Sequence, residues 1–98
     1  MADEGWVLEV TVTHLAGKQV HNVPVRPAEG ETLTKTVLSK IDAIRQKLDE
    51  GKSLVLTHPP TMYPPKRILL LAFDLTNPNA KSQEIAVVMA ELGIIPTD

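Results

Sequence analysis

With 98 residues, the chain has the size of one small domain, which can bury about two thirds of the surface that its unfolded form exposes. It contains no cysteine, and this excludes disulfides, thiolate zinc sites and a cysteine nucleophile. Its formal net charge is −2, with acidic and basic residues spread along the sequence, so no broad basic surface is expected for nucleic acid or anionic lipid.

The N-terminal segment MADEGW is acidic and lacks the charged and apolar pattern of a signal peptide. The longest apolar run, Ile68–Phe73, is far shorter than the about 20 residues of a membrane helix. We therefore expect a cytoplasmic protein without a membrane segment, in which residues 1–98 form a single α+β domain with a flexible N-terminus over residues 1–5.

Residues 6–14 are predicted to form a half-buried strand, because apolar and polar residues alternate through the segment WVLEVTVTH. A second strand is predicted over residues 19–26. The residues that share its apolar face are His21, Val23 and Val25. A hairpin that pairs Val12 with His21 brings the apolar faces of both strands together.

The turn of this hairpin is expected to span four residues, Leu15–Lys18. A tighter turn at Ala16 and Gly17 would place Pro24 in a hydrogen-bonded pair, although proline has no N–H to donate, and would force a positive φ on Ala16. Pro24 also predicts that the second strand lies at an edge of the sheet.

Residues 33–48 are predicted to form an amphipathic helix, because apolar residues recur at spacings of four, four, three and four. These residues are Leu33, Val37, Ile41, Ile44 and Leu48. Thr32 or Thr34 is the expected N-cap, and Gly51 is the expected stop. The apolar stripe is expected to dock on the sheet.

The segment Lys52–Leu75 is predicted to contain two strands separated by a proline-rich loop. The first strand covers residues 53–58, the loop residues 59–66, and the second strand residues 67–75. Because the second strand is apolar on both faces, it is predicted to be the central strand of the sheet.

A second helix is predicted up to Gly93, with Asn77 as its cap and Pro78 at its first position. The residues expected on its inner side are Lys81, Ile85, Val88 and Leu92. The short apolar tail Ile94–Pro96 is expected to dock on the domain.

The resulting order is ββαββα. It predicts a two-layer α+β sandwich in which both helices cover one face of a four-stranded, mostly antiparallel sheet. One helix on each face is the alternative arrangement, and the pattern does not determine the order of the strands.

His58, Tyr63 and Lys66 are the candidate catalytic or ligand-binding residues, because they surround the proline-rich loop at the end of a strand. No GxSxG elbow and no glycine-rich phosphate loop accompanies them. His14 and His21 lie diagonally on one face of the predicted hairpin, but without a third ligand in sight they do not predict a metal site. No cofactor is predicted.

Nucleic-acid binding is not expected from the distribution of charge or of aromatic residues. Lys40 and Lys47 lie on the first helix, but Asp42 and Asp49 are interspersed with them, as on an ordinary solvated helix. The three aromatic residues are scattered along the chain, whereas single-strand binders stack bases on clustered aromatic side chains.

Apolar surface left uncovered by the helices is the strongest functional signal in the sequence. Residues 67–75 carry apolar side chains on both faces, and helices on one side can cover only one of them. The other face would expose an apolar patch, which a second copy related by a twofold axis would cover. The residues expected at this interface are Val55, Met62, Tyr63, Ile68, Leu70 and Ala72.

The sequence therefore favours a non-enzymatic interaction module over an enzyme. We expect a homodimer that forms through the open sheet face, or through the edge of the strands at 53–58 and 67–75, with the proline-rich loop beside the interface. The alternative is a small enzyme or ligand-binding protein, in which a small molecule binds in a pocket near His58, Tyr63 and Lys66.

Overall fold

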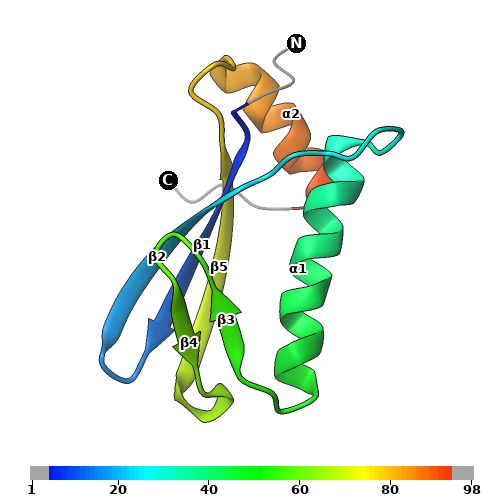
Figure 1. Cartoon of the computed structure of the whole chain (residues 1–98). Coiled ribbons are helices and arrows are strands. Elements are labelled where there is room, and N and C mark those ends of the chain that lie inside the picture. The colour runs from blue at the N-terminus through cyan, green and yellow to red at the C-terminus, as the bar shows by residue number, and fades with distance from the viewer. Residues whose placement is uncertain (1–4, 94–98) are drawn as a thin grey trace.

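A computed structural model describes residues 5–93 of the chain (Figure 1). The fold is α+β, as predicted, but its order is ββαβββα. The elements are β1 (Val7–His14), β2 (Gly17–Pro24), α1 (Leu33–Asp49), β3 (Leu54–Leu56), β4 (Thr61–Tyr63), a short 3-10 helix (Pro65–Arg67), β5 (Ile68–Thr76) and α2 (Ser82–Leu92). The expectations for the N-terminus before Gly5 and for the tail Ile94–Pro96 lie outside the described residues.

The described strands form a three-stranded antiparallel sheet and a separate two-stranded hairpin, so the prediction of one four-stranded sheet is wrong. The order in the larger sheet is β2–β1–β5. Its central strand is β1, and the prediction that the strand at residues 67–75 is central is also wrong. Apolar residues on both faces of β5 do not reflect burial on both faces, because Leu70 and Ala72 remain exposed.

The hairpin of β1 and β2 has the predicted buried face but a different register. His21 lies opposite Val10 instead of Val12, and His14 lies opposite Gly17, so the turn consists of Leu15 and Ala16. Side chains in a strand repeat every two residues, and a shift by two residues keeps the same side chains on the core face. The shorter turn is possible because Gly17, with φ 137°, adopts the positive φ instead of Ala16.

Pro24 lies on an edge strand, as predicted, since β2 is at one end of the strand order. The N–H of Val25 donates to the carbonyl oxygen of Trp6 at 2.9 Å. Because backbone groups alternate between the two sides of an antiparallel strand, the preceding residue faces away from β1. Pro24 therefore removes no hydrogen bond from the sheet.

The proline-rich segment 59–66 is not only a loop. It contains β4, in which Tyr63 pairs with Leu54 and Thr61 pairs with Leu56 of β3. Leu54, Leu56 and Tyr63 are buried, and their burial stabilises this small hairpin. A strand of three residues is too short to show the alternation by which strands are predicted.

Both ends of α1 match the prediction. Thr32 is the N-cap, and its Oγ1 accepts a hydrogen bond from the N–H of Lys35 at 3.2 Å. At the other end, the N–H of Gly51 donates to the oxygen of Leu48 at 3.0 Å, and the N–H of Lys52 donates to the oxygen of Lys47 at 2.9 Å. This is the Schellman pattern, which the positive φ of Gly51, 71°, permits.

The second helix begins later than predicted. Asn77 closes a turn in which its Oδ1 accepts from the N–H of Asn79 at 2.8 Å. The N-cap of α2 is Lys81. Its side chain is exposed, so the prediction that Lys81 lies on the inner side of the helix is wrong. Gly93 ends the helix as predicted, with φ 74°. The residues of α2 that pack in the core are Ile85, Val88, Met89 and Leu92.

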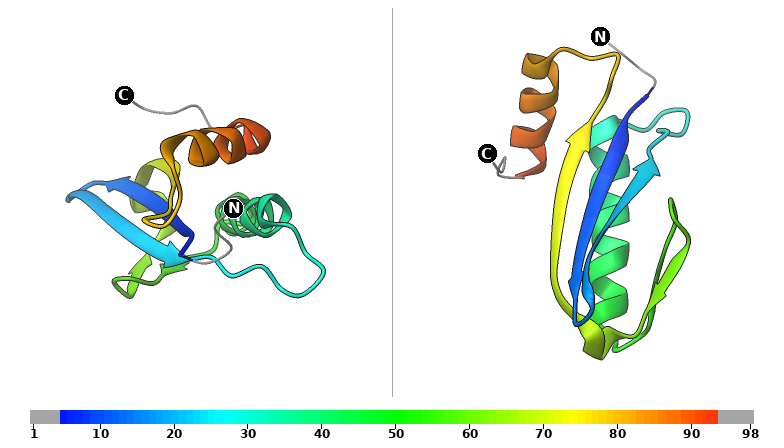
Figure 2. Two further views of the ribbon diagram at one scale, coloured as in Figure 1. Left: turned by 90° about the horizontal axis from the view of Figure 1, so that it is seen from above. Right: turned by 90° about the vertical axis from the view of Figure 1, so that its left-hand side faces the viewer.

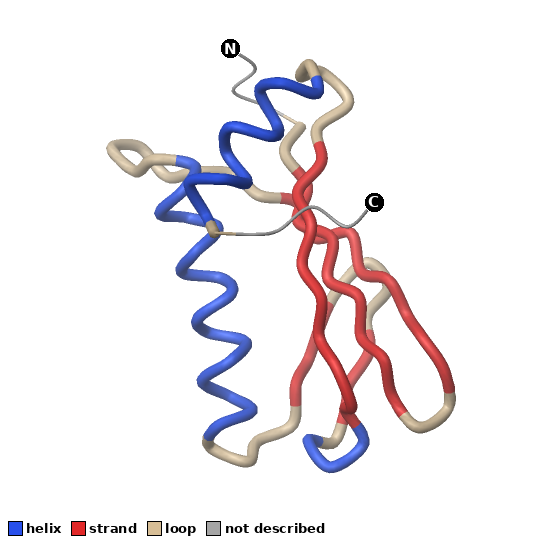
Figure 3. The backbone as a smooth tube through the Cα atoms, turned by 180° about the vertical axis from the view of Figure 1, so that it is seen from behind, coloured by secondary structure: helices blue, strands red, loops and turns tan. Residues whose placement is uncertain are grey.

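The core lies between the two helices and the three-stranded sheet. Buried residues that form it include Leu8, Val10 and Val12 of β1, Val37 and Ile41 of α1, and Met89 and Leu92 of α2. Figure 2 shows α1 and α2 on the same side of the sheet, with the β3–β4 hairpin beyond β2. Figure 3 shows the same arrangement from behind. Within residues 5–93, neither helix has the length and apolar character that a membrane crossing requires.

Candidate functional site

A buried polar cluster joins the three-stranded sheet to the β3–β4 hairpin. His21 of β2 is fully buried. Its Nδ1 lies 3.1 Å from the carbonyl oxygen of Thr57, and its Nε2 lies 2.6 Å from the hydroxyl oxygen of Tyr63. Because a carbonyl oxygen can only accept, Nδ1 donates to it, and in a neutral ring that is protonated at Nδ1 the Nε2 atom accepts from the Tyr63 hydroxyl. Both ring nitrogens of a neutral histidine are therefore satisfied.

Further contacts around this cluster hold the hairpin against β2. The N–H of Asn22 donates to the carbonyl oxygen of His58 at 3.1 Å. The ring of Tyr63 lies 5.6 Å from the ring of His14 and 5.5 Å from that of His21, between ring centroids. Since His21 has no exposed surface, the cluster positions the hairpin and offers no place where a substrate could reach the imidazole.

The two histidines of the predicted β1–β2 hairpin both contact the ring of Tyr63. Within residues 5–93, however, no group of three or more metal-ligating side chains is arranged to hold an ion. His14 and His21 thus have no third ligand there.

The three predicted catalytic residues occupy three different environments. Tyr63 is buried, with 5% of its surface exposed. His58 is exposed in the turn between β3 and β4, has φ 60°, and its Nδ1 lies 2.8 Å from Oγ1 of Thr57. Lys66 is exposed in the 3-10 helix beyond the other end of β4. Among the described residues, Lys66 forms no hydrogen bond or ion pair with His58 or Tyr63, and His58 and Lys66 lie beyond opposite ends of β4.

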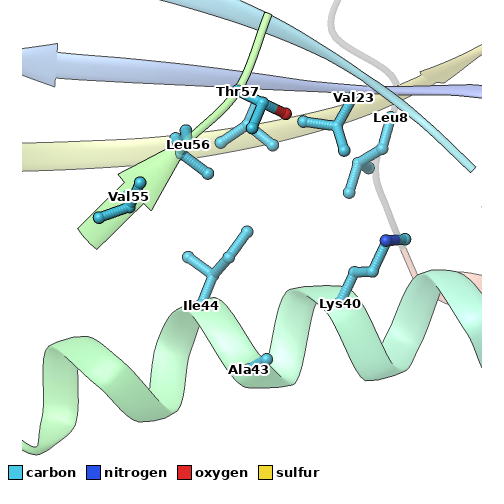
Figure 4. A pocket seen from close by; sticks show the side chains of 9 residues that line it. Leu8, Val23, Lys40, Ala43, Ile44, Val55, Leu56 and Thr57 are labelled. Atoms are coloured by element: carbon cyan, nitrogen blue, oxygen red, sulfur yellow. The ribbon is translucent and has the colours of Figure 1, made fainter. Parts of the chain in front are cut away.

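A groove of about 200 Å³ runs between α1, the larger sheet and β3 (Figure 4). Its walls are mostly aliphatic side chains: Leu8, Val10, Val23, Ile44, Val55 and Leu56. Lys40 of α1 also lines the groove, at the end near Leu8 (Figure 4). No local pattern in the sequence predicts this groove, because its residues come from elements far apart along the chain.

The predicted interface residues fall on separate surfaces. Leu70 and Ala72 pair with Thr13 and Thr11 of β1 and are exposed on the sheet face that points away from the helices. Val55 and Met62 are exposed opposite each other on the β3–β4 hairpin, beyond the other edge of the sheet. Of the remaining two residues, Tyr63 is buried and Ile68 is half-buried.

The outer edge of β5 carries backbone groups that no neighbouring strand binds within the described chain, where β5 pairs only with β1. The backbone of Trp6 faces β2, because its carbonyl oxygen accepts from the N–H of Val25. Backbone groups of successive residues face opposite edges of a strand, so the odd-numbered residues of β1, such as Thr11, face β5. Ala72 is the partner of Thr11 and faces β1 in turn. The N–H and C=O groups of Leu71 and Phe73 therefore point outward.

This edge is also apolar at its start. Leu69 and Leu70 are each 62% exposed. At the other end of the strand, Oδ1 of Asp74 accepts from the outward N–H of Leu75 at 2.8 Å. From Leu69 to Phe73 the backbone edge is thus open, and the side chains of Leu69, Leu70 and Ala72 are exposed, whereas Leu71 and Phe73 are half-buried against the core. The sequence pattern could not identify Leu71 and Phe73 as edge residues, because it does not contain the strand order.

The opposite edge of the sheet, along β2, is protected. Pro24 has no N–H to offer, and the outward N–H of Asn22 is bound by His58. Natural sheets use proline and covering loops in this way to prevent pairing between edges. The two edges of this sheet therefore differ, and only the β5 edge resembles a surface for strand pairing.

A comparison of the chain with protein-family models, curated proteins and solved structures found no match. The proposals below rest on the geometry of its own residues.

Proposed function

We propose that the chain is a small interaction module that pairs with a second copy of itself through the outer edge of β5. The observation that carries this proposal is the outward-pointing backbone of Leu71 and Phe73 in a strand with exposed apolar side chains. An exposed apolar strand edge is a template for pairing with another chain, and a twofold axis is the commonest way for two copies to pair.

Antiparallel pairing about a twofold axis through Ala72 uses this edge fully. Leu71 of one copy then lies opposite Phe73 of the other, and the two exchange N–H to C=O hydrogen bonds. Each such bond contributes about 0.5–1.5 kcal/mol net. Ala72 lies opposite Ala72 at the centre, where a small side chain permits close approach of the strands. Leu69 and Leu70 lose part of their exposed apolar surface, which adds a hydrophobic contribution.

The first test is the oligomeric state of a matched pair of variants, measured by sedimentation equilibrium from about 1 to 100 µM, the range in which Kd values of small interfaces fall. Leu70→Glu places a charge at the proposed interface. Met62→Glu makes the same kind of change at a side chain of similar exposure, 66%, on the β3–β4 hairpin. We expect a dimer for the natural sequence and for Met62→Glu, and a monomer for Leu70→Glu.

A strict monomer of the natural sequence throughout this range would contradict the proposal. If Met62→Glu dissociates the dimer and Leu70→Glu does not, the interface lies on the hairpin and the β5 edge is excluded.

The second test distinguishes the strand edge from the open sheet face, which Leu70 also borders. Amide hydrogen exchange of Leu71 and Phe73 is expected to slow as the protein concentration rises, because their N–H groups become bound in the dimer. The amide of Val20 also points outward, but from the edge of β2, and its exchange should not depend on concentration. Concentration-independent exchange at Leu71 and Phe73 in a dimer would exclude edge pairing.

A further inference from the structure

We propose that the groove between α1, the sheet and β3 binds a short aliphatic carboxylate, with the carboxylate at Lys40 and the hydrocarbon chain directed toward Val55. This groove lies beside β2, across the sheet from the β5 edge, so the proposal does not depend on self-association. Figure 4 shows Lys40 near one end of the groove and Val55 near the other.

The aliphatic walls of the groove favour a hydrocarbon chain. Leu8 and Val23 come from the sheet, Ile44 comes from α1, and Leu56 comes from β3. These side chains present no hydrogen-bonding groups. Besides Lys40, Thr57 is the lining residue with a polar side chain, so a polar ligand body would lose most of its bonds to water without replacement. A hydrocarbon chain would instead remove apolar surface from water.

The size of the groove restricts the length of the chain. Its volume is about 200 Å³, and a water-sized group takes up about 30 Å³. The groove therefore corresponds to about six or seven such groups. Its volume is smaller than the about 300–1,000 Å³ of sites for drug-sized ligands. Nucleotides and long-chain lipids are too large to be enclosed.

The charge at the groove favours an acid over an alcohol or an amine. Lys40 is half-buried and lines the groove. Among the described residues it forms no ion pair, and no acidic side chain lines the groove. The aliphatic part of a lysine can lie along an apolar surface while its ammonium group stays at the rim. Its ammonium group would therefore meet a carboxylate at the end of the groove.

The test is a titration of the methyl NMR signals of the whole chain with sodium hexanoate, 1-hexanol and hexylamine. Hexanoate is expected to shift the methyl signals of Leu8, Val23, Ile44 and Leu56, with a Kd in about the millimolar range for a ligand of this size. Hexanol should bind the same residues about fivefold more weakly, because it lacks the ion pair with Lys40. Hexylamine, which carries the opposite charge, should bind most weakly.

Three variants test the assignment of the site. Lys40→Gln should weaken hexanoate binding about fivefold and leave hexanol binding unchanged. Lys47→Gln, at an exposed position on the same helix that does not line the groove, should leave both unchanged. Ala43→Leu places a larger side chain at the groove wall and should abolish binding of both ligands while the helix is retained.

The proposal is overturned if hexanoate shifts none of these methyl signals or shifts only residues outside the groove. It is equally overturned if hexanol binds as tightly as hexanoate, if Lys40→Gln and Lys47→Gln behave alike, or if Ala43→Leu binds hexanoate normally. The methyl signals report binding in the groove whether the chain is a monomer or a dimer. A negative result in this titration therefore does not bear on the proposed pairing of β5 strands.

Discussion

At the scale of single residues, the hydrogen bond between His21 and Tyr63 connects the three-stranded sheet to the β3–β4 hairpin. The bond joins residues 42 positions apart, and both side chains are buried. A buried donor or acceptor without a partner destabilises the folded state, whereas a satisfied pair specifies how two elements dock. We therefore interpret the pair as the contact that fixes the β3–β4 hairpin on β2.

Tyr63→Phe is expected to lower the free energy of unfolding by about 1–3 kcal/mol, because Nε2 of the buried His21 loses its donor. Urea unfolding of the variant measures this change. In a chain in which His21→Leu has already been made, the same tyrosine change has no bond to remove and should be neutral or stabilising. An equal loss in both backgrounds would show that the His21–Tyr63 bond contributes nothing.

The sequence brought His58, Tyr63 and Lys66 together as a candidate site because they are close along the chain. In the structure, β4 lies between His58 and Lys66, and an extended strand rises about 3.3 Å for each residue. His58 and Lys66 therefore lie beyond opposite ends of this strand. The partner that Tyr63 does have, His21, could not be predicted, because no local pattern records a contact over 42 residues.

At the scale of elements, the ends of α1 were predictable because each depends on a local rule. Gly51 ends the helix with φ 71°, and a Cβ added there would meet no atom within 4 Å. Gly51→Ala should therefore lower stability only through its backbone conformation, by about 1–2 kcal/mol. Gly51→Asn should lower it less, because asparagine tolerates positive φ. Thermal unfolding of both variants checks this order, and an equal loss for both would contradict it.

The strands show what local sequence patterns cannot predict, namely the register of a hairpin and the position of a strand in the sheet. Alternation predicted the buried face of β1 and β2 correctly, but it cannot distinguish two registers that differ by two residues, since both keep the same face inward. The turn decides between them, and a two-residue turn of Leu15 and Ala16, which the positive φ of Gly17 permits, replaces the expected four-residue loop. For β5, apolar residues on both faces indicated a central strand, yet the same pattern also fits an edge strand whose second apolar face is exposed.

At the scale of the whole molecule, the two edges of the larger sheet are unequal. The β3–β4 hairpin and Pro24 protect the β2 edge, whereas the β5 edge is open from Leu69 to Phe73 within the described chain. A dimer formed through β5 would join two three-stranded sheets into one continuous sheet. In that dimer both protected edges lie on the outside, so association would end at two copies instead of extending into a fibre.

The register of this dimer can be tested by the sign of a charge. If the twofold axis passes through Ala72, Leu70 of one copy lies opposite Asp74 of the other. Leu70→Glu then opposes like charges and should weaken association at least about tenfold, whereas Leu70→Lys gains an opposite-charge pair and should stay within about threefold of the natural sequence. The difference should shrink in 1 M salt, where the Debye length is about 3 Å.

An axis through Leu71 would instead place Leu70 opposite Ala72, and both variants would then weaken the dimer equally. Sedimentation equilibrium of the two variants at low and high salt therefore decides between the two registers.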